Sequence, residues 1–289
     1  MRTPQDTVAL VTGANSGIGK AVATGLARWG ASVTLVVRNP AKGEQTMGDI
    51  RRTVPGARLE LLVADLSDQR SIRAAAASFL RSHSELHVLV NVAGVFLPKR
   101  LVTPDGLEAT FATNYVSYFL LTNLLLPALR QGKPARIVNV ASRYGGTAID
   151  FEDMQLEHRQ YSYLKSTPPT MLARVLFTQE LSERLAGTGV VVNAVHPGLV
   201  AHTELLNQTG GFFRVLTNMF GGTPEKGADT PLWLATAPEN ETVTGKMWAS
   251  RKPMKTPGQG SDPQARKRLW TETEHLVAGT GQVGPDRSP

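Results

Sequence analysis

Short apolar runs rich in β-branched residues alternate along the chain with longer segments of helical periodicity. The apolar runs span residues 8–13, 31–38, 59–66, 86–94, 135–142, 190–198 and 245–249. Because the central runs are apolar at successive rather than alternate positions, we expect strands that are buried on both faces, as in parallel sheets. The alternation therefore predicts an α/β fold with a doubly wound, Rossmann-type parallel sheet of about seven strands and helices on both faces.

The alternation continues without a Pro/Gly-rich linker or an internal repeat, which predicts a single domain over residues 1–278. Residues 204–224 stand apart from the alternation as a variable insertion. Residues 279–289 are rich in glycine and proline, and we expect a flexible tail there.

Composition narrows the classes of partner. With 41% hydrophobic and 19% charged residues among 289, the chain can bury a sizeable core. The net charge of +7 is not gathered into Lys/Arg runs with interleaved aromatics, so we expect anionic small molecules rather than nucleic acid. No apolar run reaches the roughly 18 to 20 residues of a membrane span, and cysteine is absent. We therefore expect a cytoplasmic protein without disulfides, thiolate chemistry or a metal site.

The stretch "TGANSGIG", residues 12–19, joins the first predicted strand to a helix. Its glycines permit a tight turn and a close backbone approach, and the helix N-terminus offers unpaired N–H groups to a pyrophosphate. A strand-to-helix turn without a ligand is the alternative. The turn predicts a dinucleotide site that includes Gly13, Asn15, Ser16, Gly17, Ile18 and Gly19.

The end of the second predicted strand, "VVRN", indicates which dinucleotide binds. A carboxylate there would accept the ribose hydroxyls of NAD, whereas a cation would hold the 2′-phosphate of NADP. The chain has Arg38, whose planar guanidinium suits a phosphate, so we predict NADP(H) as the cofactor. A surface arginine without a ligand is the alternative.

These motifs, together with several further along, resemble the short-chain dehydrogenase/reductase superfamily over nearly the whole chain. The glycine spacing is Thr-Gly-x-x-x-Gly-x-Gly, and the later motifs are "VADL", "NVAG", "TNYVSYFLLT", "VNVAS" and "HPG". The stretches "RNPAKGE", "TPEKGADTPLWLAT" and "TGKMW" look most like the retinol-dehydrogenase-like branch.

The resemblance implies further cofactor contacts, a substrate lid and an oligomeric state. The implied contacts are Asp65, Leu66, Asn91, Ala93, Gly94, Pro197, Gly198 and Thr203. Residues 204–224 fall where the family closes a lid, and their apolar side chains suit a hydrophobic small-molecule substrate, although core packing explains them equally well. Members of the family usually form homodimers or homotetramers, so the resemblance implies one of these states.

In the family a tyrosine relays the proton, a lysine lowers the tyrosine pKa and grips the ribose, a serine polarises the carbonyl and an asparagine holds a water. The candidates for these roles are Ser142, Asn114, Tyr161 and Lys165. Capping of backbone groups is the alternative role for Ser142, and bracing of a helix is the alternative role for Asn114.

Tyr161 and Lys165 have the right spacing, but Pro168 and Pro169 follow directly. Because proline has no N–H for the helix ladder, we expect a helix that begins at Ser166 or Thr167, with Tyr161 and Lys165 in the loop before it. Counting 22 residues back from Asn193 agrees, since by the family register Met171 and Thr167 fill the lysine and tyrosine positions. The alternative is a rearranged loop that returns Tyr161 or Tyr163, with Lys165, to the site.

Threonine and methionine cannot replace the tyrosine and the lysine, because one is too weak an acid and the other carries no charge. The sequence therefore predicts an atypical NADP(H)-dependent oxidoreductase of biosynthesis that acts on a hydrophobic small molecule without the usual tyrosine relay. A non-redox cyclase or isomerase on the same scaffold and a catalytically silent binding protein are the alternatives.

Overall fold

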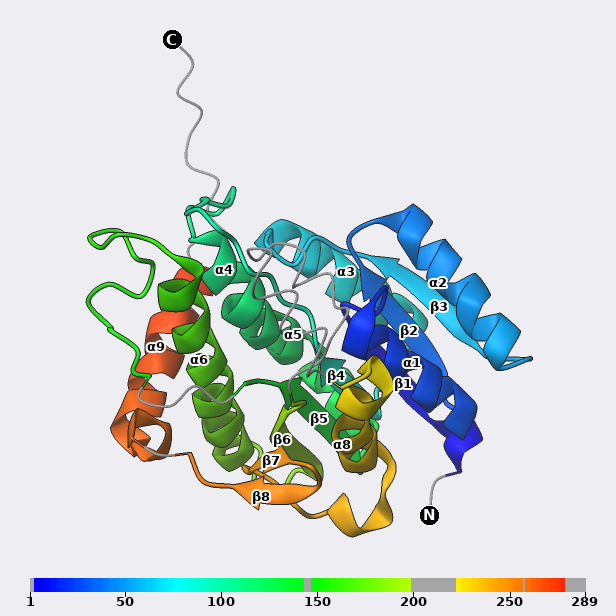
Figure 1. Cartoon of the computed structure of the whole chain (residues 1–289). Helices are drawn as coiled ribbons and strands as arrows, with labels where there is room; N and C mark the ends of the chain where they lie inside the picture. Colours follow the sequence, from blue (N-terminus) through cyan, green and yellow to red (C-terminus); the bar gives the residue numbers. More distant parts are fainter. Residues whose placement is uncertain (1–2, 143–146, 199–221, 257, 279–289) are drawn as a thin grey trace.

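The computed structural model describes residues 3–142, 147–198, 222–256 and 258–278 (Figure 1). Most of the expected lid at 204–224, the expected contact Thr203 and the expected tail at 279–289 lie outside these ranges. Across the described ranges, none of the helices combines the length and the apolar character that a bilayer span requires.

One eight-stranded sheet forms the centre of the molecule, in the order β3-β2-β1-β4-β5-β6-β7-β8. All neighbouring strands pair in parallel except β7 and β8, which are antiparallel. The doubly wound parallel sheet is thereby confirmed, with one short edge strand more than expected. The strands are β1 Val8–Thr12, β2 Ser32–Val37, β3 Leu59–Val63, β4 Val88–Asn91, β5 Ala135–Val140, β6 Val190–His196, β7 Met247–Ala249 and β8 Lys252–Met254.

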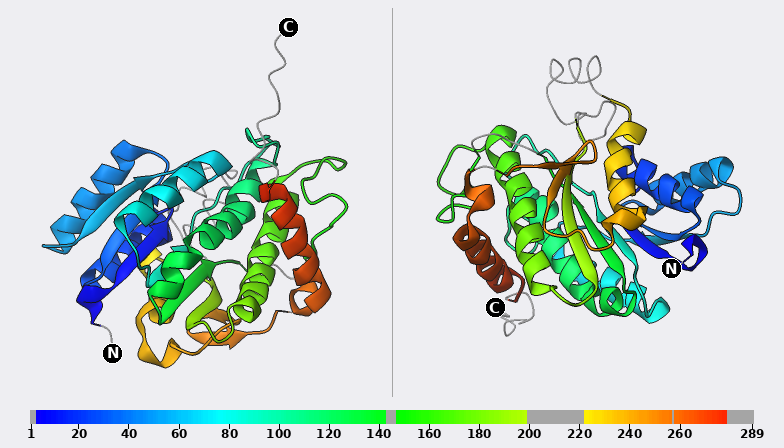
Figure 2. Two further views of the ribbon diagram at one scale, coloured as in Figure 1. Left: turned by 180° about the vertical axis from the view of Figure 1, so that it is seen from behind. Right: turned by 90° about the horizontal axis from the view of Figure 1, so that it is seen from below.

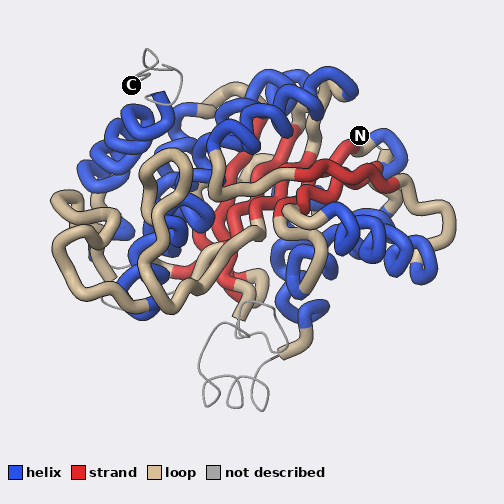
Figure 3. The backbone as a smooth tube through the Cα atoms, turned by 90° about the horizontal axis from the view of Figure 1, so that it is seen from above, coloured by secondary structure: helices blue, strands red, loops and turns tan. Residues whose placement is uncertain are grey.

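Helices cover both faces of the sheet (Figures 2 and 3). Each layer of helices has its own hydrophobic core against the sheet. One core packs under α1 Gly17–Trp29, α2 Pro40–Thr53 and α8 Pro224–Thr236. The other packs under α3 Gln69–Ser82, α5 Ser117–Gln131, α6 Tyr163–Arg184 and α9 Pro263–Ala278. Successive strand residues alternate between the two cores, since Ala9 and Val11 belong to the first and Leu10 to the second. This alternation explains why the strands are apolar at successive positions.

Short helical turns complete the chain at the edges of these layers. They are η1 Pro4–Asp6, α4 Ala109–Phe111, the π-helical turn η2 Ala112–Val116, η4 Pro238–Asn240 and η5 Gly258–Ser261. The turns α4 and η2 run directly into α5, so residues 109–131 form one helical rod with a π-turn near its start. Such π-turns are frequent at functional sites.

The expected start of the helix after Tyr161 is wrong, because α6 begins at Tyr163 and runs through Pro168 and Pro169. Its first turn is closed by Ser162, whose carbonyl accepts from the backbone N–H of Lys165 and of Ser166, both at 2.9 Å. The prolines remove the N–H groups that would pair with the carbonyls of residues 164 and 165. This turn lies at the surface, where the Leu164 side chain is 66% exposed, so water can satisfy those carbonyls.

Candidate cofactor cleft and active site

A cleft of ≈ 390 Å³ opens at the carboxyl ends of β1, β2, β4 and β5. The strand order changes direction between β1 and β4, and ligands of doubly wound sheets bind at such a switch point. Of the residues expected from the sequence, those that line the cleft are Gly13, Asn15, Ser16, Gly17, Ile18, Gly19, Arg38, Asp65, Leu66, Ala93, Gly94, Ser142 and Pro197. The structure thus brings the predicted cofactor motifs together in one place.

The glycine turn between β1 and α1 is sterically fixed. Gly13 has φ +64°, and a Cβ atom there would lie 2.9 Å from the Cα of Ala93. A Cβ atom on Gly19 would lie 2.2 Å from the carbonyl oxygen of Gly13. Ser16, the N-cap of α1, makes no side-chain cap hydrogen bond. Among the described residues the first turn of α1 therefore has no side-chain acceptor, which leaves its N–H groups for a phosphate.

The side of the cleft formed after β2 and β3, where the sequence analysis expects the adenosine, contains Arg38 and Asp65. Arg38 follows the last residue of β2 and is exposed, so its guanidinium has room to meet a phosphate. The neighbouring Asn39 accepts a hydrogen bond from the backbone N–H of Lys42 at 3.1 Å and caps α2. Asp65 accepts from the backbone N–H and the hydroxyl of Ser67, at 2.9 and 2.7 Å, which fixes its carboxylate at the cleft wall.

Asn91 lies behind the cleft rather than in its lining. Its side-chain N–H donates to Asn139 at 2.9 Å and to Thr122 at 3.1 Å, and Asn139 in turn donates to Thr178 at 2.9 Å. All four residues are fully or almost fully buried. This polar chain ties β4 and β5 to α5 and α6. Gly198, with φ +81°, also stands outside the lining residues.

Ser142 and Asn114 differ in their access to the cleft. Ser142 lies two residues past the end of β5 and lines the cleft with its neighbour Ala141. Asn114 is fully buried, where its side chain accepts from the backbone N–H of Val95 at 2.7 Å and donates to the Val95 carbonyl at 3.0 Å. The Asn114 side chain thus braces the chain after β4 from behind, whereas Ser142 lies at the cleft wall.

Tyr161 lies outside the cleft. Its hydroxyl donates to Glu108 at 3.1 Å and shares a hydrogen bond of 2.8 Å with Thr110. Glu108 also accepts from the backbone N–H of Thr110 and of Phe111 as the N-cap of α4. Burial raises the pKa of Tyr161, the opposite of what a proton relay near neutral pH requires. Through these contacts Tyr161 attaches the segment that precedes α6 to the start of α4.

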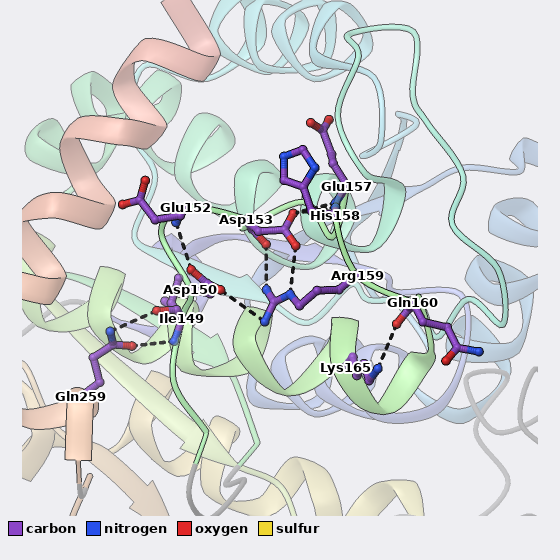
Figure 4. Close-up of polar contacts among 10 residues, drawn as sticks. All are labelled: Ile149, Asp150, Glu152, Asp153, Glu157, His158, Arg159, Gln160, Lys165 and Gln259. Carbon is purple, nitrogen blue, oxygen red and sulfur yellow. Dashed lines mark hydrogen bonds and ion pairs between the residues drawn. The ribbon is translucent and has the colours of Figure 1, made fainter.

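Lys165 also lies away from the cleft, since its ammonium donates to the carbonyl of Gln160 at 3.2 Å (Figure 4). It lines a second pocket of ≈ 510 Å³ between α4, residues 147–159 and the start of α6. Arg159 crosses this region and pairs with Asp150 at 3.3 Å and with Asp153 at 2.9 Å. The second pocket is not at the ends of the strands, so the cleft is the better candidate for the active site.

Met171 and Arg174 are the residues of α6 that line the cleft. Met171, which the register from Asn193 assigns to the lysine position, lines the cleft, whereas Thr167 is buried and does not reach the lining. Lys165 lies six residues before Met171, which turns it by about 240° around the helix axis. Sequence reasoning missed Arg174, although its position three residues after Met171 on the same helix face could have indicated it.

The chemistry available in the cleft follows from these side chains. Ser142 can donate a hydrogen bond to a developing oxyanion, and Arg174 brings a positive charge. Neither tyrosine nor histidine occurs among the lining residues that the structure describes. This part of the cleft can polarise a carbonyl, but it lacks the usual side chain for proton relay.

Known proteins are similar to this chain in sequence and architecture. A family model described as short chain dehydrogenase matches residues 7–155. Retinol dehydrogenase 13 of Mus musculus is 38% identical over 277 residues, covering 93% of this chain and 83% of that protein. Retinol dehydrogenase 12 of Homo sapiens is 40% identical over 276 residues, covering 93% and 86%. The crystal structure of a Mycobacterium paratuberculosis protein superposes with a TM-score of 0.78 at 30% identity, covering 96% of both chains.

Proposed function

Because the chain belongs to the short-chain dehydrogenase family of oxidoreductases, we propose that it is an NADP(H)-dependent oxidoreductase that works without the tyrosine relay. What supports this proposal is the face that α6 turns to the cleft, which carries Met171 and Arg174 and, among the described lining residues, neither a tyrosine nor a lysine of α6. Tyr161 and Lys165 point elsewhere and make local contacts.

A bound nicotinamide dinucleotide supplies or accepts a hydride at its ring. The residues of the chain then have three tasks, which are to bind the phosphates, to exclude water and to polarise the substrate. The turn at Gly13–Gly19 and Arg38 serve the first task, and the Ser142 hydroxyl serves the third. Such a site suits a substrate that needs little proton donation, for example a conjugated enal or enone. The names of the retinol dehydrogenase relatives support a hydrophobic, conjugated substrate.

The direct test of the reaction class is turnover of a panel of apolar conjugated enals and enones with NADPH, followed at 340 nm and by mass spectrometry. Loss of absorbance with a product two hydrogen atoms heavier supports the proposal. A product of unchanged mass would indicate a cyclase or isomerase, a reaction class that the missing relay also permits. Tight NADPH binding without any turnover would indicate a binding protein.

We expect Arg38→Asp to weaken NADPH binding by about 30- to 100-fold while it changes NADH binding by less than about threefold. The substitution removes the charge-assisted hydrogen bonds to the 2′-phosphate and places a like charge beside it. Calorimetric titration of both dinucleotides measures the two affinities. Arg51→Asp makes the same change of charge at an exposed site of α2 outside the cleft, and it should leave both affinities as they are. An equal preference for the two dinucleotides in the unmodified protein would refute the assignment.

We expect Tyr161→Phe and Lys165→Ala to leave turnover within about threefold of the unmodified enzyme, since removal of a true general acid costs about 100- to 10,000-fold. Tyr161→Phe should instead lower the free energy of unfolding by about 1 kcal/mol, because the hydroxyl binds Glu108 and Thr110. Urea unfolding and steady-state kinetics give the two readouts. Ser142→Ala is the matched comparison, with an expected loss of turnover of about 100-fold. Loss of activity in Tyr161→Phe at unchanged stability would make Tyr161 the relay after all.

A further inference from the structure

The second pocket, of ≈ 510 Å³, is separate from the cofactor cleft, since the two have no described lining residue in common. Its walls come from the start of α4, from residues 147–159 and from the first turns of α6. A cavity of this size can hold a small organic molecule. Much of its lining is apolar, and these residues are Phe111, Ile149, Met154, Leu156, Leu164, Pro168, Pro169 and Ala173.

Glu108 contributes a buried carboxylate to this lining, with a side chain in a residue that is 1% exposed. Its two oxygens accept from the backbone N–H of Thr110 at 2.8 Å and of Phe111 at 2.7 Å, and from the Tyr161 hydroxyl at 3.1 Å. Among the described residues, every group that donates to Glu108 is neutral. The helix that Glu108 caps compensates part of the charge, but a buried carboxylate is usually paired with a cation as well.

The other charged side chains of the pocket do not balance this carboxylate. Asp150 and Asp153 share one guanidinium, because Arg159 pairs with Asp150 at 3.3 Å and with Asp153 at 2.9 Å (Figure 4). Lys165 is exposed, and its ammonium donates to a backbone carbonyl of the neighbouring loop. The lining thus has three carboxylates against two cations, which leaves an excess of negative charge.

The wall formed by α6 adds hydrogen-bond acceptors. Pro168 and Pro169 have no N–H for the carbonyls of Leu164 and Lys165, and all four residues line the pocket. These carbonyl oxygens therefore remain available to water or to a donor group of a ligand. An ammonium group has N–H donors and no acceptor, so it suits both the carbonyls and the excess of negative charge.

We propose that this pocket is a binding site for a small organic cation, namely an amine that carries an apolar body. Its ammonium group would pair with the Glu108 carboxylate, and its apolar body would pack against the ring of Phe111 and the two prolines. An organic anion does not suit the site, because it would meet the same carboxylates. The proposal does not depend on the proposed oxidoreductase function, since the pocket shares no described wall with the cofactor cleft.

The test compares three probes that have the same tail, phenylbutylamine, phenylbutanol and phenylpentanoate, by calorimetric titration of the full chain without dinucleotide or substrate. We expect the amine to bind with a dissociation constant of about 0.1 to 1 mM, as suits a ligand of its size. The alcohol and the carboxylate should each bind at least about 10-fold more weakly, because they lack the charge-assisted hydrogen bond to Glu108.

Glu108→Gln removes the charge and keeps the size of the side chain. It should weaken binding of the amine by about 10- to 100-fold and change binding of the alcohol by less than about threefold. A merely structural role of Glu108 would weaken both probes alike, so the ratio of the two constants is the readout. Asp68→Asn is the matched control, since Asp68 caps α3 through its side chain and lies outside both pockets. It should leave the ratio unchanged.

Lys165→Glu tests the same pocket at an exposed residue, and it serves if Glu108→Gln does not fold. The added negative charge should tighten binding of the amine by about fivefold, an effect that salt reduces, and leave the alcohol as it is. Lys267→Glu makes the same change at an exposed site of α9 outside the pocket and should have no effect.

Three results would overturn the amine site. They are equal affinities for the three probes, no binding of the amine, and an amine-to-alcohol ratio that stays the same in folded Glu108→Gln or in Lys165→Glu. None of these results affects the oxidoreductase proposal, which is tested by turnover with NADPH.

Discussion

Gly19→Ala is expected to lower the free energy of unfolding by about 2 kcal/mol and to weaken NADPH binding by about 10- to 100-fold. The new Cβ atom would lie 2.2 Å from the carbonyl oxygen and 2.7 Å from the carbonyl carbon of Gly13, so backbone must move. Overpacking of this kind costs up to about 3 kcal/mol, which outweighs the gain of about 1 kcal/mol from alanine in a helix. The displaced turn would also lose phosphate hydrogen bonds worth about 1.5–3 kcal/mol each.

Gly48→Ala is the control for the same chemical change. Gly48 lies inside α2, and no atom stands within 4 Å of the Cβ that alanine would add. This variant should be more stable than the unmodified protein by up to about 1 kcal/mol and should bind NADPH equally well. Urea unfolding and calorimetric titration measure both quantities. If the two alanine variants had the same stability and the same affinity for NADPH, the close approach of α1 to Gly13 would not explain the effect of Gly19→Ala.

Phe177→Ala is expected to lower the free energy of unfolding by about 3–5 kcal/mol. Phe177 is 1% exposed and joins α6 to the second core through three aromatic neighbours. Its ring centroid lies 6.4 Å from that of Tyr115, 5.6 Å from that of Phe119 and 5.9 Å from that of Trp270. Truncation removes these contacts and leaves a cavity between α5, α6 and α9.

Leu164→Ala is the comparison on the same helix, and it should change the free energy of unfolding by less than about 0.5 kcal/mol because Leu164 is 66% exposed. Thermal and urea unfolding of the two variants, each followed by circular dichroism, give the difference. A small effect of Phe177→Ala would mean that the aromatic cluster can close around the missing ring.

The sheet was predictable because its signal lies within each segment. Runs such as "VALVT" and "VVVNAV" are apolar at nearly every position, and only strands buried on both faces bring such runs into two cores. The edge strand β8 was missed, since it has three residues and follows a turn in which Ser250 and Arg251 have positive φ. Neither the short strand nor the turn before it produces a hydrophobic pattern that is long enough to predict a strand.

The convergence of the glycine turn and Arg38 on one cleft was predictable for a similar reason. The glycine turn and Arg38 carry their chemistry in consecutive residues or at the end of a strand, and the structure places them in one cleft. The first residue of α6 was not predictable from the local sequence. Pro168 and Pro169 favour a helix that begins near them, but Ser162 and the contacts of Tyr161 with α4 add a further turn. Arg174 was missed and the buried hydrogen bonds of Asn91 were not foreseen, because the surroundings of both residues come from β4, β5 and η2, which are distant in sequence.

The buried hydrogen bonds from Asn91 through Asn139 to Thr178 determine which sequence changes the protein can accept in the segment before α6. Thr178 receives its hydrogen bond from β5, and it also donates to the carbonyl of Arg174 at 2.8 Å. A slip of the helix by one residue would break this buried pairing, so the faces of Met171 and Arg174 are set from the strands and not from the loop. Insertions, deletions and substitutions among residues 147–162 would then change the loop before α6 and leave the position of the helix as it is. Evolution could thus change the first turn of α6, which carries Lys165, without shifting the wall of the cofactor cleft.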